Sequence, residues 1–142
     1  MTNFASMPRR LRREIVRRAH HLCEYCHLQQ ELCPESFEVD HIIPQALDGP
    51  TTLENTCLAC PLCNNAKRSR VTGVDPDSGR RVRLFNPRSQ QWDAHFCWSR
   101  DAGRLLGRTI TGRATVSALD MNRLRVVRIR LLWAAIGLHP PE

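Results

Sequence analysis

The sequence predicts a small α+β protein. Short strand-like segments alternate with amphipathic helical segments, and cysteines paired at two-residue spacing occur twice, as Cys23 with Cys26 and as Cys60 with Cys63. Each pair can present two thiolates from one tight turn, and four thiolates complete a tetrahedral zinc shell that needs no water ligand. With 142 residues, of which 42% are hydrophobic, the chain is long enough for one modest core with flanking elements.

The chain is strongly basic, and this favours one class of partner. Its net charge is +7, its pI is about 9.5, and 20 of its 21 basic residues are arginine. A basic surface attracts polyanions, so we expect nucleic acid as the partner. No apolar run approaches the length of a membrane span, and the first 18 residues lack the apolar segment of a signal peptide. We therefore expect a cytoplasmic protein with no membrane partner.

The remaining cysteines leave alternatives open. The total of seven is odd, which argues against a fully paired disulfide framework. Cys33, Cys57 and Cys97 lie outside the two pairs, and we expect them to be ordinary partly buried thiols. Cys57 precedes Cys60 by three residues and could compete as a ligand, although two-residue spacing matches the first pair better. A redox pair is the opposing interpretation of a CxxC motif, but two such motifs fit a bipartite zinc shell better.

The N-terminal segment, residues 1–22, is predicted to be a basic amphipathic helix. Over residues 8–22 its apolar positions recur at helical spacing, at Leu11, Ile15, Ala19 and Leu22. The rest of its surface carries six arginines: Arg9, Arg10, Arg12, Arg13, Arg17 and Arg18. These arginines either face phosphate or form a solvated surface, and the sequence leaves both possibilities open.

The second segment, residues 23–72, contains the two cysteine pairs. Residues 37–43 read as a strand that carries Asp40 and His41 near its end, and the following Pro- and Gly-containing stretch reads as a turn. Residues 53–58 run back across, and residues 64–70 read as a short helix.

The third segment, residues 73–142, is predicted to be an accessory extension packed on the cysteine-containing segment. Residues 81–85 read as a strand, and 96–99 with 104–109 as a hairpin. A final helix is expected over 120–136, with Gly137 as its C-cap. This helix should place one apolar face inward: Leu124, Val127, Leu131 and Ala135.

From Cys23 to Lys67 the chain resembles the HNH endonuclease family, in its four-cysteine form with asparagine in the last signature position. The resemblance covers about a third of the chain and lies in Asp40 to Pro44, in Asn55, and in Cys60 to Lys67. It implies a ββα-metal core, in which a strand, an excursion, a returning strand and a helix surround a catalytic metal site. It also implies a metal-dependent enzyme that hydrolyses phosphodiester bonds of DNA.

Four residues of this matching stretch suit that chemistry. Histidine titrates near neutrality, so His41 can take a proton from water as a general base. The resemblance implies that Asn55 orients this ring by bonding to backbone near it. Asp40 and Asn64 offer a carboxylate and an amide oxygen, which together suit Mg²⁺ or Mn²⁺. The cofactors expected are therefore one structural Zn²⁺ and one catalytic divalent cation.

We expect the DNA, most simply duplex DNA, to be contacted by basic residues that flank the signature: Arg12, Arg13, Arg17, Lys67, Arg68 and Arg70. The alternative function is a non-catalytic, zinc-stapled nucleic-acid-binding module, and a third is a zinc domain for protein interaction. Binding alone would need none of Asp40, His41, Asn55 and Asn64, so their joint presence favours the enzyme. Target specificity, a nick or a double-strand break, and the oligomeric state stay open.

Overall fold

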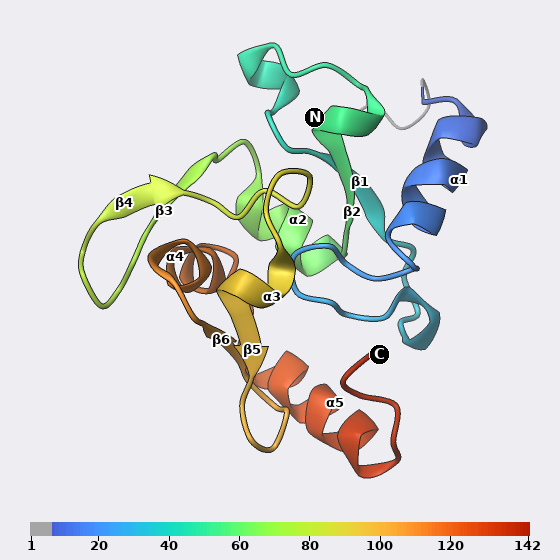
Figure 1. The fold of residues 1–142 in the computed structure, drawn as a ribbon. Coiled ribbons are helices and arrows are strands. Elements are labelled where there is room, and N and C mark those ends of the chain that lie inside the picture. The colour runs from blue at the N-terminus through green and yellow to red at the C-terminus, as the bar shows by residue number, and fades with distance from the viewer. Residues whose placement is uncertain (1–6) are drawn as a thin grey trace. The chain divides into compact units, whose positions relative to one another are not determined.

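The structure is a computed structural model that describes residues 7–142, and it divides the chain into two compact units (Figure 1). The first unit runs to Val71 and takes in Asn86–Ser89, and the second comprises Thr72–Phe85 and Gln90–Glu142. Each unit contains both helices and strands, which confirms the α+β class. Residues 1–6 of the predicted N-terminal segment lie outside the described part. Within that part, no helix is both long and apolar enough to cross a membrane.

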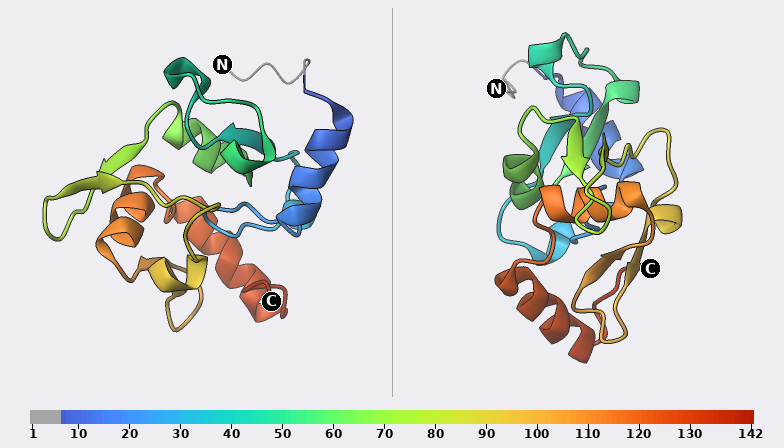
Figure 2. Two further views of the ribbon diagram at one scale, coloured as in Figure 1. Left: turned by 45° about the horizontal axis from the view of Figure 1, so that its top comes forward. Right: turned by 90° about the vertical axis from the view of Figure 1, so that its left-hand side faces the viewer.

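Helix α1 (Arg9–Arg18) opens the first unit and lies beside β2 (Figures 1 and 2). Its predicted stripe is confirmed at its centre, because Ile15 and Ala19 are buried. The helix ends earlier than predicted. His20 and His21 have positive φ angles of 53° and 60°, a conformation that an α-helix cannot continue.

The centre of the first unit is an antiparallel pair of strands, β1 (Glu38–His41) and β2 (Thr56–Ala59), followed by helix α2 (Pro61–Lys67), which contacts β1. Helix α2 begins three residues before the predicted start. Proline is favoured at the first helical position, and the Cys60 sulfur accepts a hydrogen bond from Cys63 N at 3.4 Å. Three single-turn 3₁₀ helices complete this unit: Gln30–Leu32, Gln45–Leu47 and Leu53–Asn55.

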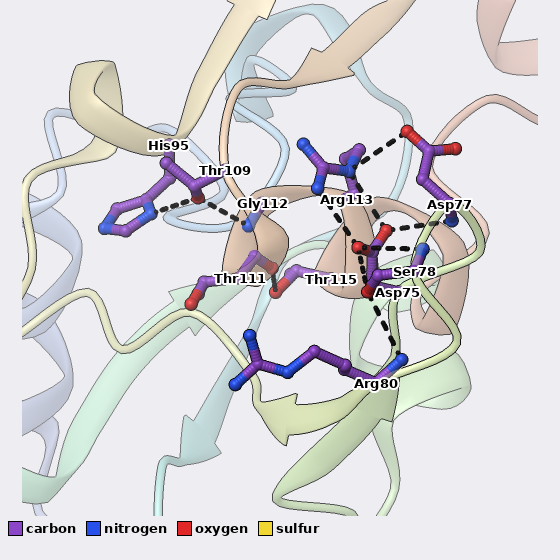
Figure 3. A network of polar contacts seen from close by, with 10 residues as sticks. All are labelled: Asp75, Asp77, Ser78, Arg80, His95, Thr109, Thr111, Gly112, Arg113 and Thr115. Atoms are coloured by element: carbon purple, nitrogen blue, oxygen red, sulfur yellow. Dashed lines mark hydrogen bonds and ion pairs between the residues drawn. The ribbon is translucent and has the colours of Figure 1, made fainter.

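The second unit begins with a hairpin of β3 (Thr72–Val74) and β4 (Arg81–Arg83), of which only β4 was predicted. Asp75 organises its turn: the carboxylate accepts bonds from the backbone of Asp77 and Ser78 and pairs with Arg113 at 3.0 Å (Figure 3). The hydrogen bonds from Arg113 and Ser78 hold the pKa of Asp75 well below its usual range. Since its acceptors are occupied within the fold, we interpret Asp75 as a structural anchor.

A short helix, α3 (Trp92–His95), leads into the predicted hairpin, which is confirmed as β5 (Phe96–Trp98) paired with β6 (Leu105–Gly107). Helix α4 (Ile110–Ala118), which was not predicted, packs on β6. A Cβ atom on Gly112 would lie 2.0 Å from the carbonyl oxygen of His95, so only glycine permits this close approach.

The last helix, α5 (Leu124–Ala135), is shorter than predicted, and the inward face assigned to it was wrong. Of the four residues predicted to point inward, Leu124, Leu131 and Ala135 are exposed and Val127 is half-buried, whereas the buried residues are Val126 and Arg130. Leu124 is 63% exposed, whereas Arg130 is 1% exposed. The guanidinium of Arg130 donates to the carbonyl oxygens of Gly103 and Met121, so a charged residue occupies the inner face.

Candidate metal and nuclease site

The four predicted zinc ligands come together in the first unit. Cys23, Cys26, Cys60 and Cys63 are all buried, and their sulfur atoms lie within 4.8 Å of one another. The sulfurs of Cys26 and Cys60 are 3.8 Å apart. A tetrahedron with Zn–S bonds of ~2.3 Å has edges of ~3.8 Å, so this geometry fits a structural zinc ion.

Each cysteine pair is presented by its own local structure. The first pair sits in a turn closed by hydrogen bonds from Cys23 N to Leu28 O and from His27 N to Cys23 O. The second pair stands at the start of α2, where Cys60 caps the helix. Cys57 does not belong to the cluster, because its thiol points to Asp40 with its sulfur 3.9 Å from Oδ2. The geometry therefore excludes Cys57 as a competing zinc ligand.

Asp40 and His41 end β1 and line a cavity of about 410 Å³. Asn64, from α2, lines the same cavity. Glu38, which sequence reasoning missed, also lines it, because residues two apart on a strand share a face. Its carboxylate accepts a hydrogen bond from Nδ2 of Asn64. This bond fixes the orientation of the amide and leaves Oδ1 of Asn64 available as a ligand.

The His41 ring has one engaged nitrogen and one without a partner. Its Nε2 lies 2.8 Å from the hydroxyl oxygen of Thr51, whereas its Nδ1 is buried and has no hydrogen-bond partner among residues 7–142. If Nε2 donates to Thr51, Nδ1 carries the basic lone pair. Burial lowers the pKa of His41, with Asp40 opposing and Lys67 adding to that effect. The neutral, proton-accepting form is therefore favoured.

Asn55 closes the loop that carries Thr51. Its Oδ1 accepts from Ile43 N at 2.9 Å, and its Nδ2 donates to the carbonyl oxygens of Ile43 and Pro50 at 3.0 and 2.8 Å. The loop is tight: a Cβ atom on Gly49 would lie 1.7 Å from Ile43 O. Asn55 thus bonds to backbone two residues beyond His41 and brings Thr51 back to the His41 ring.

Asp40 and Lys67 form a buried ion pair. Nζ of Lys67 lies 3.1 Å from Oδ2 of Asp40, and the two side chains are 2% and 5% exposed. The phenol of Tyr25 donates to the same Oδ2 at 2.7 Å. Burial raises the pKa of Tyr25 well above its usual range, which keeps it a donor. The prediction that Lys67 contacts phosphate is contradicted here, because its ammonium is enclosed and bonded to protein.

The predicted DNA-contacting arginines separate into anchored and exposed groups. Arg12 donates to Phe37 O at 2.7 Å, and Arg18, at the end of the same helix, donates to Leu53 O and Thr56 O. These bonds tie α1 to the fold, so for Arg12 the structure supplies a partner other than phosphate. The exposed members of the set are Arg13, Arg17, Arg68 and Arg70, of which Arg68 lines the cavity.

The site residues that were not predicted differ in how clearly the sequence indicates them. Glu38 could have been found, because it lies two residues before Asp40 on a predicted strand. Tyr25 lies within the first CxxC motif, which places it near the metal module but does not reveal its bond to Asp40. Thr51 carries no comparable signal, since its approach to His41 depends on how the loop closes.

One segment of the chain matches a known protein family. Residues 23–70 match the family model of HNH endonucleases, which confirms the resemblance over the segment that contains the cysteine cluster and the cavity. This match indicates a nuclease or nucleic-acid-related function for that segment. No match to the chain was found among curated proteins or among solved structures.

Proposed function

We propose that residues 23–70 form a metal-dependent endonuclease that hydrolyses phosphodiester bonds of duplex DNA. The observation that carries this proposal is the cavity lined by Asp40, His41 and Asn64, together with the unpartnered Nδ1 of His41. Residues 23–70 match the family model of HNH endonucleases, and this resemblance implies that the three positions carry the general base and the metal ligands. A module that only bound nucleic acid would need no such arrangement.

In the proposed mechanism, His41 takes a proton from the attacking water through Nδ1, which is buried in the substrate-free protein and has to become accessible to that water when the substrate binds. Thr51 accepts a hydrogen bond from Nε2–H and so keeps the ring in the required tautomer. Asn55 acts one step further away, because it closes the loop that presents Thr51. The Lys67 ammonium bonds to the carbonyl oxygen of His41 at 3.1 Å and holds the end of β1.

The donor set of the cavity fits a hard divalent cation. Asp40 and Glu38 offer carboxylates and Asn64 an amide oxygen, and Mg²⁺ and Mn²⁺ prefer such oxygen ligands. When bound, the cation would neutralise charge on the phosphate and stabilise the leaving 3′ oxygen. We propose Asp40 and Asn64 as its protein ligands, with Glu38 orienting the Asn64 amide.

The second candidate is a non-catalytic, zinc-stapled nucleic-acid-binding module, and one observation favours it. The Asp40 carboxylate already has the Lys67 ammonium as its counter-ion, so a metal cation is not needed to balance its charge.

The two candidate functions differ in what happens to bound DNA. Zinc-loaded protein is incubated with a labelled duplex, with and without added Mn²⁺. The nuclease predicts binding in both samples and cleavage only with Mn²⁺, and binding without cleavage in both would favour the module.

Replacing Thr51 should slow catalysis without weakening DNA binding. Thr51→Val removes the acceptor for Nε2–H of His41 but keeps the shape of the side chain. Loss of one hydrogen bond of about 1 kcal/mol should lower the cleavage rate roughly five- to tenfold. The matched control is Thr52→Val at the next position, which should cleave at the wild-type rate. Equal rates for both variants would remove Thr51 from the mechanism.

We propose that exposed arginines on α1 contribute to duplex binding. Binding affinity should fall as salt rises, with a log–log slope of about −0.9 per phosphate contacted. Changing Arg13 and Arg17 together to glutamine should flatten that slope by about two units, because both side chains are exposed. A salt titration checks this. Arg18→Gln is the control: it breaks bonds to Leu53 and Thr56 and should lower thermal stability instead. An unchanged slope in the double variant would show that these two arginines of α1 do not contact DNA.

A further inference from the structure

Lys67 is the only lysine in a chain with 20 arginines, and it is 2% exposed. Arginine is the preferred cation everywhere else in this sequence, so a compact ammonium at this position needs a physical reason. Lysine and arginine differ in shape: an ammonium is a point charge with three donors, whereas a guanidinium is a flat fork. The contacts of Lys67 match those expected of an ammonium.

The Lys67 ammonium reaches three acceptors from α2. Its Nζ lies 3.1 Å from Oδ2 and 3.3 Å from Oδ1 of Asp40, and 3.1 Å from the carbonyl oxygen of His41. Three acceptors match the three N–H donors of an ammonium, so no donor is left for a phosphate. The pair therefore ties α2 to the end of β1, where the proposed metal ligand Asp40 and the proposed base His41 stand.

The Asp40 carboxylate is enclosed by donors from separate parts of the first unit. Besides Lys67 it receives the Tyr25 hydroxyl, and the Cys57 thiol from β2 lies near it. Its side chain is 5% exposed, so little water can stabilise its charge. A buried charge is strongly disfavoured when its partner is removed, and Lys67 is the one cation in contact with Asp40 among the described residues.

A divalent cation bound at Asp40 would share a carboxylate with this ammonium. Two like charges close together in a partly buried site repel each other, and screening by salt is weak there. Lys67 must therefore oppose binding of the cation at the same time as it holds the carboxylate in place.

We propose that Lys67 is the internal counter-ion of Asp40 and sets the affinity of the cavity for divalent cations by competing for that carboxylate. Lys67 is thus a positioning residue, and its effect on the metal rests on the proposed function, in which Asp40 is a ligand. Substitution of a residue at a binding site usually weakens binding, and here we expect the opposite. Removing the lysine should weaken the fold but tighten the binding of the cation.

The test is a titration of zinc-loaded protein with Mn²⁺ alone, followed by thermal unfolding. Lys67→Met keeps the length of the side chain and removes its charge. We expect a lower unfolding temperature than wild type without Mn²⁺, and a midpoint of Mn²⁺-induced stabilisation about tenfold lower or more. Tyr25→Phe is the matched control, because it removes a hydrogen bond to the same oxygen without altering charge, and its midpoint should stay near that of wild type.

An Mn²⁺ midpoint for Lys67→Met equal to or higher than that of wild type would overturn the proposal. If Lys67→Met fails to fold, the pair is tested by Asp40→Asn combined with Lys67→Met, which removes both charges. The double variant should be more stable than Lys67→Met alone, and equal instability would also overturn the proposal. Failure of the proposed function gives a different result: no DNA cleavage by wild type, while Lys67→Met still binds Mn²⁺ more tightly.

Discussion

Cys23→Ser should leave the first unit unfolded and unable to retain zinc. The four sulfurs are buried within 4.8 Å of one another, so removing one thiolate opens the shell that closes this unit. Structural zinc contributes about 10–16 kcal/mol of binding free energy at neutral pH, and a small domain has only about 5–15 kcal/mol of net stability. The binding free energy lost with the zinc site is therefore larger than the net stability that the rest of the unit can provide.

Zinc content by elemental analysis and thermal unfolding by circular dichroism check this expectation. The wild-type protein should carry one zinc ion per chain. Cys97→Ser is the matched control, because Cys97 lies in the second unit and outside the cluster, so this variant should keep both the zinc and the unfolding temperature. A zinc-free wild type, or a Cys23→Ser variant with wild-type stability, would contradict the zinc assignment.

His41→Ala should remove cleavage while leaving DNA binding nearly intact. A positioned general base contributes roughly 10² to 10⁴ in rate, and His41 offers the unpartnered Nδ1. The rate is measured at saturating protein on a labelled duplex, so that a change in binding cannot imitate a change in chemistry. Asn65→Ala is a suitable control, since Asn65 lines the same cavity but cannot act as a base at neutral pH.

A loss of less than tenfold in His41→Ala would remove the histidine from the chemical step. A loss that is matched by weaker DNA binding would show that the ring supports the fold or the interface. Comparison with Thr51→Val then separates the base from the residue that orients it, because the smaller effect is expected for the threonine.

The parts of the fold that could be predicted depend on local signals. The two CxxC pairs predict their own cluster, because the spacing places both sulfurs of each pair in one turn. The hairpin of β5 and β6 was predicted from its strand-like segments and the turn residues between them. Helix α4 was missed because its residues include Gly112 and several β-branched side chains, which are poor helix formers, so packing on β6 must stabilise it.

In the candidate site, too, some features follow from local sequence signals and others depend on the folded structure. Asp40, His41 and Asn64 could be placed together from the order of their motif, and they line one cavity. The burial of Lys67 could not be predicted, because charged side chains are normally exposed and only the paired carboxylate makes burial tolerable. The hydrogen bond between His41 and Thr51 depends on closure of a loop between two strands, and no spacing in the sequence reports that closure.

The most direct measurement of the central proposal is conversion of supercoiled plasmid by the zinc-loaded protein. Wild type and His41→Ala are compared with added Mg²⁺, with added Mn²⁺ and with neither, and the zinc content is verified afterwards in each sample. Our account predicts relaxed or linear plasmid only for wild type with a divalent cation. Intact plasmid under all conditions, or equal conversion by His41→Ala, would contradict it.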